Sequence, residues 1–218
     1  GMHVGIIFMI INFLLKPLDY SHKLCWLKAL LLLLTIWFYA QITGLAPSVK
    51  RAAAMFTFVT IGGLLRRPVN IFHSLFASLF FLLLLNPLLI FEIGFEMSYL
   101  AVFGIVIFQP KIVALYKPRT IIFNYFWELT AVSISAQLAT FPLSVFYFGQ
   151  FPNYFLLANL SVIALSFVVV VTGVVLLVTS WLSIVSNFIG KVLTVEIKLL
   201  NGIVSGIDSL PGSVTDNI

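Results

Sequence analysis

Polar side chains are few in this sequence, and in two apolar segments they recur at intervals of three and four residues. A helix brings such positions to one face, so each segment carries a narrow polar stripe on an apolar cylinder. In hydrocarbon a polar group requires a partner or a water-filled cavity, so aligned stripes indicate a path across a membrane. The stripes consist of Thr130, Ser133, Gln137, Thr140 and Ser144, and of Lys191, Thr194, Lys198, Asn201, Ser205 and Asp208.

Two amides, Gln137 and Asn159, lie in the middle of apolar segments. An amide without a partner in hydrocarbon costs several kcal/mol, so we expect both side chains to face the protein interior. Two interpretations stay open: the amides line a hydrated path, or they bind each other and hold neighbouring helices together. Small residues such as the Gly202 and Gly206 pair are also typical of plain helix packing in membranes.

A basic turn at residues 44–52 is the sharpest local feature. Glycine and proline interrupt the chain there, and Ser48 is a candidate cap for a helix that begins with Val49, Lys50 and Arg51. Free N–H groups beside two cations can bind a phosphate, whereas basic residues at helix ends more often signal membrane topology. We expect this turn to support a conduit on its cytoplasmic side. The same two interpretations apply to Arg66 and Arg67.

The sequence predicts no catalytic residue, no metal site and no cofactor, so we expect no enzyme. Its histidines, His3, His22 and His73, lack the paired spacing of metal ligands, and no nucleophile elbow, P-loop or dinucleotide motif is present. Glu92 and Glu96 lie one helical turn apart, which suits a cation or proton site. We favour a role for Glu96 at a helix N-terminus, where a carboxylate complements the helix dipole.

The composition predicts an integral membrane protein. Hydrophobic residues make up 61% of the chain and charged residues 9%, whereas soluble domains contain about 25% charged residues. The net charge of +5 comes from lysines and arginines scattered near the ends of apolar segments. We interpret these cations as topology signals rather than as a nucleic-acid-binding patch.

Apolar runs predict an all-α fold, a polytopic helical bundle with one short or re-entrant helix and a C-terminal amphipathic helix. We expect the acidic connection at 86–96 outside the cell and the basic connection at 110–119 in the cytoplasm. The expected helices cover residues 4–15, 24–42, 69–85, 97–108, 121–146, 154–182 and 187–210, with the short helix at 52–65.

The helix expected at 187–210 is about 36 Å long, enough to cross a hydrocarbon core of about 30 Å. An interfacial helix usually has a broad and strongly charged polar face, whereas this stripe is narrow. We therefore expect the helix to pack against the bundle with its stripe turned to a hydrated cleft. An interfacial position is the alternative.

Several motifs in order resemble the transmembrane competence domain of ComEC-type DNA-internalisation proteins. Thr43–Ala52 is similar to the Thr-Gly-x-x-x-Ser-x-x-Arg-Ala signature of that family, and Gly94–Val102 to its Gly-Phe-Gln-Leu-Ser-Phe-x-Ala-Val segment. Glu96 stands where Gln is usual, and Asn86 where Asp is usual. Further matches lie at Gly1–Gly5, Arg66–Pro68, Asn86–Pro87, Gln137–Leu143, Phe148–Gly149, Asn159–Leu160 and Leu210–Ser213.

The resemblance implies an inner-membrane channel domain that takes up single-stranded DNA in natural transformation. It implies a competence domain at residues 1–213, shortened at its N-terminus, and the start of a linker to a further domain at 214–218. Single-stranded DNA, membrane lipid, flanking domains and other competence proteins are the expected partners, in the bacterial cytoplasmic membrane. The residues expected to line the path are Lys50, Arg51, Arg66, Arg67, Gln137, Thr140, Asn159, Lys191, Lys198 and Asn201.

Two other function classes remain open on the sequence. A solute or ion transporter also uses broken helices and polar groups at the membrane midplane. A membrane scaffold that anchors soluble domains would use the stripes for packing only.

Overall fold

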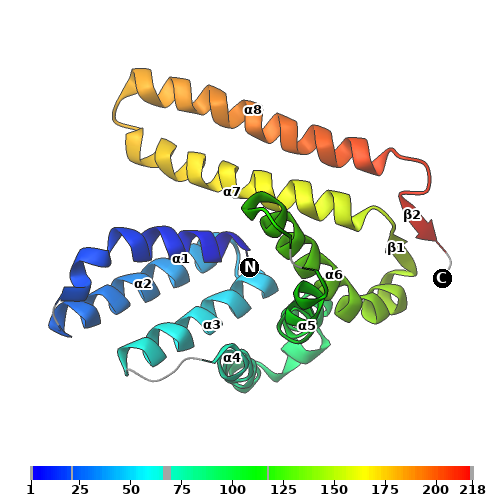
Figure 1. Cartoon of the computed structure of the whole chain (residues 1–218). Coiled ribbons are helices and arrows are strands. Elements are labelled where there is room, and N and C mark those ends of the chain that lie inside the picture. The colour runs from blue at the N-terminus through cyan, green and yellow to red at the C-terminus, as the bar shows by residue number, and fades with distance from the viewer. Residues whose placement is uncertain (1, 21, 66–69, 117, 217–218) are drawn as a thin grey trace. The chain divides into compact units, whose positions relative to one another are not determined.

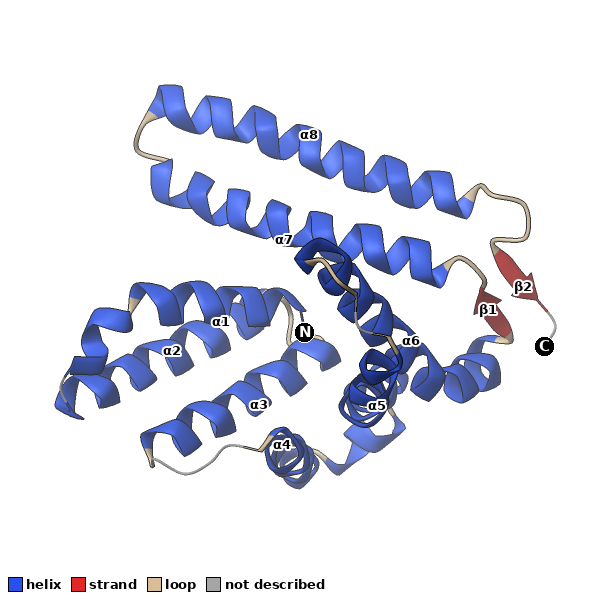
Figure 2. Cartoon of the chain, viewed as in Figure 1, coloured by secondary structure: helices blue, strands red, loops and turns tan. Residues whose placement is uncertain are grey.

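A computed structural model describes residues 2–20, 22–65, 70–116 and 118–216. Those residues form eight α-helices, which confirms the all-α expectation (Figures 1 and 2). The helices are α1 (Met2–Leu14), α2 (His22–Ile42), α3 (Pro47–Leu64), α4 (Ile71–Leu85), α5 (Ile93–Leu115), α6 (Ile121–Phe148), α7 (Phe155–Thr179) and α8 (Ser183–Asp208). Short 3₁₀ turns cover Lys16–Tyr20 and Pro87–Phe91.

Four of the described helices are long and apolar enough to cross a membrane. They are Leu24–Ile42 of α2 and the whole of α5, α6 and α7. The apolar helices α1 and α4 are shorter. Large apolar side chains are exposed along most of the helices, as Leu34, Phe80 and Leu177 illustrate at 59%, 70% and 73%. Such surfaces suit a lipid solvent, so the protein is a membrane protein.

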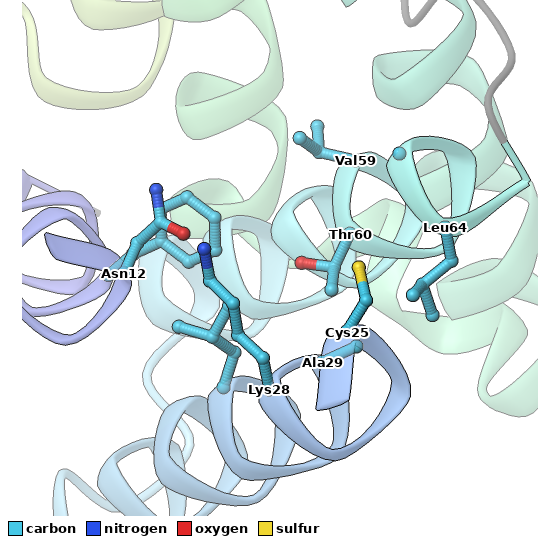
Figure 3. A pocket seen from close by; sticks show the side chains of 10 residues that line it. Asn12, Cys25, Lys28, Ala29, Val59, Thr60 and Leu64 are labelled. Carbon is cyan, nitrogen blue, oxygen red and sulfur yellow. The ribbon is translucent and has the colours of Figure 1, made fainter. Parts of the chain in front are cut away.

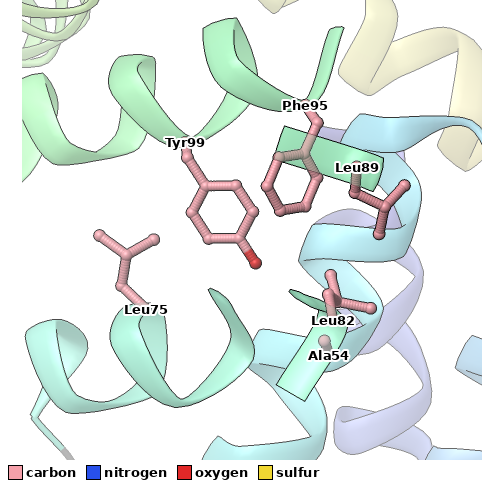
Figure 4. Close-up of a cluster of buried hydrophobic side chains, with 6 residues drawn as sticks. All are labelled: Ala54, Leu75, Leu82, Leu89, Phe95 and Tyr99. Atoms are coloured by element: carbon pink, nitrogen blue, oxygen red, sulfur yellow. The ribbon is translucent and has the colours of Figure 1, made fainter. Parts of the chain in front are cut away.

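The chain divides into two compact units, residues 1–106 and 107–218. In the first unit α3 packs between α2 and α4, and α1 covers α2 and α3. Alanines permit this close approach because Ala52 and Ala53 join one buried cluster and Ala54 joins the other. Figure 4 shows the second cluster, in which Ala54, Phe95 and Tyr99 meet leucines of α4 and of the turn after it.

The second unit is built on a hairpin of α7 and α8, which lie side by side in Figure 1, with α6 packed against α7. Two short antiparallel strands pair at the end of the hairpin where α7 begins and α8 ends. They are β1 (Gln150–Pro152) and β2 (Val214–Asp216). Inside it, Thr172 Oγ1 of α7 donates a hydrogen bond of 3.1 Å to Glu196 Oε1 of α8. The C-terminal helix therefore runs back along its neighbour, as expected of a helix that packs on the bundle.

Two boundary predictions were wrong. Helix α3 begins at Pro47 rather than near residue 52, and its N-cap is Ala46, so Ser48 does not cap it. Proline suits the first helical position because its missing N–H would have no partner there. Helix α5 extends from Ile93 to Leu115 and includes Pro110, where a cytoplasmic loop was expected. One lost backbone hydrogen bond does not end a helix that lies in apolar surroundings.

Candidate functional site

A buried arginine links α3 to α5 in the first unit. Arg51 is 9% exposed, and its Nη1 donates a hydrogen bond to the Ser98 carbonyl oxygen. The guanidinium carbon lies 5.9 Å from the centroid of the Tyr99 ring, a cation–π distance. In the described part of the chain, Arg51 Nε has no hydrogen-bond partner. The site thus holds a positive charge with one donor still to be satisfied.

Tyr99 extends this link to α4. Its hydroxyl oxygen lies 3.0 Å from Ser78 Oγ, and Ser78 Oγ donates a 2.7 Å hydrogen bond to the Leu75 carbonyl oxygen. Since the serine proton is used there, the Tyr99 hydroxyl donates to Ser78. Ser78 is fully buried. A chain of polar contacts therefore joins α3, α5 and α4 inside an otherwise apolar core.

The turn before α3 positions Arg51. Gly44 and Leu45 have positive φ angles of 69° and 54°, and the Leu45 N–H donates to the Ala40 carbonyl oxygen at 2.9 Å. This closes the end of α2 and reverses the chain within a few residues. A left-handed conformation is costly for leucine, so the surrounding contacts of Leu45 with the buried cluster must hold it.

Gly94 permits the approach of α5. A β-carbon at this position would lie 3.2 Å from Pro47 Cγ, closer than most real contacts. Pro47 approaches Gly94, and one helical turn further along each helix Arg51 contacts Ser98. The two motifs at residues 43–52 and 94–102 therefore meet at the starts of α3 and α5. The sequence did not indicate this pairing because 47 residues separate Arg51 from its partner Ser98.

The same contact corrects the predicted sidedness. From the sequence, the 44–52 turn was expected in the cytoplasm and the 86–96 connection outside, but Pro47 lies against Gly94. Both segments are at one end of the first unit. The reason is that α3 is a complete helix antiparallel to α2, since early α3 residues contact late α2 residues and late α3 residues face early α2 residues.

Of the other basic candidates, Lys50 is half-buried beside Arg51. Arg66 and Arg67 lie outside the described residues. Glu96 falls in the first turn of α5, as expected of a residue that complements the helix dipole.

In the second unit, Gln137 lines a cavity of about 200 Å³ with Ile134, Leu138 and three phenylalanines. The Phe141 and Phe151 ring centroids are 5.2 Å apart, and those of Phe151 and Phe155 are 5.9 Å apart. The lining is almost wholly apolar, so the phenylalanine rings rather than the Gln137 amide face the cavity. No hydrogen bond in the described residues joins Gln137 to Asn159, which is half-buried on α7.

Thr140 does not offer its hydroxyl to a path. It is 9% exposed, and its Oγ1 donates to the Ala136 carbonyl oxygen of its own helix at 2.9 Å. A hydroxyl satisfied in this way is compatible with simple packing.

The stripe on α8 is exposed along its whole length, including Lys191, Lys198 and Asn201. Its opposite face, with Leu193, Leu200 and Ile207, is half-buried. The predicted role of the stripe residues in a path stays a prediction.

Two polar features were not predicted from the sequence. The Tyr99–Ser78 contact has no local signal, because the residues belong to different helices. The burial of Glu196 could have been predicted from the sequence, because Glu196 lies between Leu193 and Leu200 on the buried face of α8. Its Oε2 is buried without a hydrogen-bond partner in the described residues.

The helices and the buried cation define a polytopic α-helical membrane protein. The sequence pattern of the competence protein family matches residues 1–216. The chain belongs to that family. It is 33% identical over 155 residues to ComE operon protein 3 of Bacillus subtilis (strain 168), an alignment that covers 69% of this chain and 18% of that relative. No solved structure matches the chain.

Substitution of Gly94 tests the helix crossing. Gly94→Leu should push α5 away from Pro47 and break the Arg51–Ser98 contact, lowering the free energy of unfolding in detergent by about 1–3 kcal/mol. Gly202→Leu is the matched control, because a β-carbon added to Gly202 would meet no atom within 4 Å. Equal stability of the two variants would contradict the crossing.

Cysteine scanning tests the two faces of α8 in a Cys25→Ala background. Cysteines on the exposed stripe should react with a membrane-impermeant thiol reagent, because water reaches them, whereas those on the face toward α7 should resist. Labelling of both faces at the same rate would show that α8 does not pack on α7. The stripe positions are Thr194, Asn201 and Ser205, and the inward positions are Leu193, Leu200 and Ile207.

Proposed function

We propose that this chain forms the membrane passage of a DNA-uptake system, which moves single-stranded DNA inward across the cytoplasmic membrane in natural transformation. The observation that carries the proposal is membership of the competence protein family across residues 1–216. The chain spans about one fifth of the curated relative it matches, at 18% of its length.

The chemistry of a DNA strand fits the two sites described above. A strand presents a phosphate charge at every nucleotide and flat bases that stack on aromatic rings. Arg51 supplies a buried positive charge with a free Nε donor. The cavity beside Gln137 supplies phenylalanine rings. These features favour a nucleic-acid path over a passage for an inorganic ion.

The distribution of basic residues supports an orientation for the first unit. In the sequence, Lys16 follows α1, Lys23 comes at the start of α2, and Arg66 and Arg67 follow the end of α3. At the opposite end, Lys50 and Arg51 are accompanied by Glu92 and Glu96. Cytoplasmic segments carry the excess of lysine and arginine, so the Arg51 site faces the outside, where an incoming strand arrives.

Arg51 variants test the proposal in a transformable bacterium that lacks its own protein of this family and carries the full-length gene. Arg51→Leu should lower the transformation frequency by at least about tenfold, since a contact made by a buried charge is worth roughly 1.5–3 kcal/mol. Arg51→Lys should keep part of the activity, because it retains the charge and loses the planar guanidinium.

The control is Lys111→Met, which removes an exposed cation of α5 and should leave the frequency unchanged. Protein level in the membrane is measured for every variant. If the Arg51→Leu and Arg51→Lys variants both transform at the wild-type frequency and at normal protein level, Arg51 has a structural role only. A transporter or a scaffold would then explain the chain better.

A further inference from the structure

A second polar site lies in the first unit, at the end opposite Arg51. It is a cavity of about 260 Å³ among α1, α2 and α3 (Figure 3). Its polar lining consists of Asn12, Lys28, Thr60 and Cys25. The function proposed above uses none of these residues.

Thr60 is the unusual member of this lining. A threonine in a helix normally donates its hydroxyl proton to the carbonyl oxygen four residues earlier, as Thr57 does to Ala53 at 2.8 Å. Thr60 Oγ1 is buried and makes no hydrogen bond in the described part of the chain. A buried hydroxyl without a partner costs free energy, which a ligand oxygen in the cavity would recover.

Lys28 gives the cavity its charge. Its side chain is 8% exposed, although it sits on α2 only six residues after His22, about 9 Å along the helix axis. Figure 3 shows the ammonium group beside the Asn12 amide, with Thr60 on the facing helix. A lysine ammonium is a compact point charge that binds phosphate oxygens well.

The remaining walls are hydrocarbon, from Phe8, Ala29, Leu32, Val59 and Leu64. A cavity with one cation, a hydroxyl and an amide among apolar walls matches an amphiphile with a phosphate head. A single-stranded nucleic acid would need several cations along its length.

We infer that this cavity binds one anionic phospholipid. Its phosphate lies against Lys28 and the Thr60 hydroxyl, and an acyl chain follows Leu32 and Val59. The bound lipid joins α1 to the α2–α3 pair and stabilises that part of the unit. This inference stands independently of the proposed passage of DNA.

Cys25 reports on the site, because it is the single cysteine of the chain and lines the cavity. The 218-residue chain is placed in nanodiscs of phosphatidylcholine, with or without phosphatidylglycerol, and the alkylation of Cys25 by N-ethylmaleimide is timed. Phosphatidylglycerol should slow alkylation by about tenfold or more, the order expected of a hydrogen bond to a charged group. Native mass spectrometry should detect one retained phosphatidylglycerol.

Two variants and one control separate this site from general membrane effects. Lys28→Met should abolish the protection by phosphatidylglycerol, and Thr60→Val, which keeps the side-chain volume, should weaken it. Lys111→Met should keep it in full. If the lysine variant unfolds, the protection of Cys25 in the Thr60→Val variant decides the test. This variant should fold, because removal of an unpaired hydroxyl does not destabilise an apolar core.

Three results would overturn the inference. The first is equal alkylation of Cys25 in both membranes. The second is protection by inorganic phosphate in phosphatidylcholine alone, which would make the site one for a free anion. The third is protection by a short single-stranded oligonucleotide in phosphatidylcholine alone, which would place the cavity on the path of DNA.

Discussion

The contact between the Arg51 guanidinium and the Ser98 carbonyl oxygen governs the arrangement of the first unit. An arginine stays charged in proteins, and a charge buried in apolar surroundings costs several kcal/mol unless it is bound. The start of α5 must therefore stay beside the start of α3. Gly94 makes that approach possible, and Tyr99 passes the polar contact on to Ser78 of α4. A backbone carbonyl and an aromatic ring satisfy the cation only in part, so the Nε donor remains for another acceptor.

Both units bury small polar side chains, such as Ser78 in the first and Ser135 in the second. The first unit also buries two cations, Arg51 and Lys28, each less than one-tenth exposed. The second places one carboxylate, Glu196, inside the α7–α8 hairpin and leaves the stripe of α8 exposed. Buried polar groups tie helices together and set their register. An exposed stripe on a long helix in a membrane protein does neither, which makes it the better candidate for contact with water, a partner or a strand.

Much of this fold could be predicted from the sequence, because long apolar runs between basic or proline-containing breaks leave few alternatives in a membrane. The number and type of helices, and the two faces of α8, follow from that pattern. Local exceptions were mispredicted. Pro47 takes the first helical position that Ser48 was expected to cap, and α5 continues through Pro110. Contacts between distant segments, such as Arg51 with Ser98, could not be read from one sequence. The expectation that the 44–52 turn and the 86–96 connection lie on opposite sides was wrong because it depended on such a contact.

Site-specific photocrosslinking during uptake tests the central claim most directly, that a DNA strand passes the polar sites of this chain. A photoreactive amino acid replaces Gln137, which lines the aromatic cavity, or Leu157, which is 54% exposed on the outer surface of α7. Cells that import labelled DNA are irradiated, and DNA bound to the protein is measured. We expect crosslinks at position 137 and none above background at position 157. Crosslinks at neither position, in cells that still transform, would contradict a path through this part of the protein.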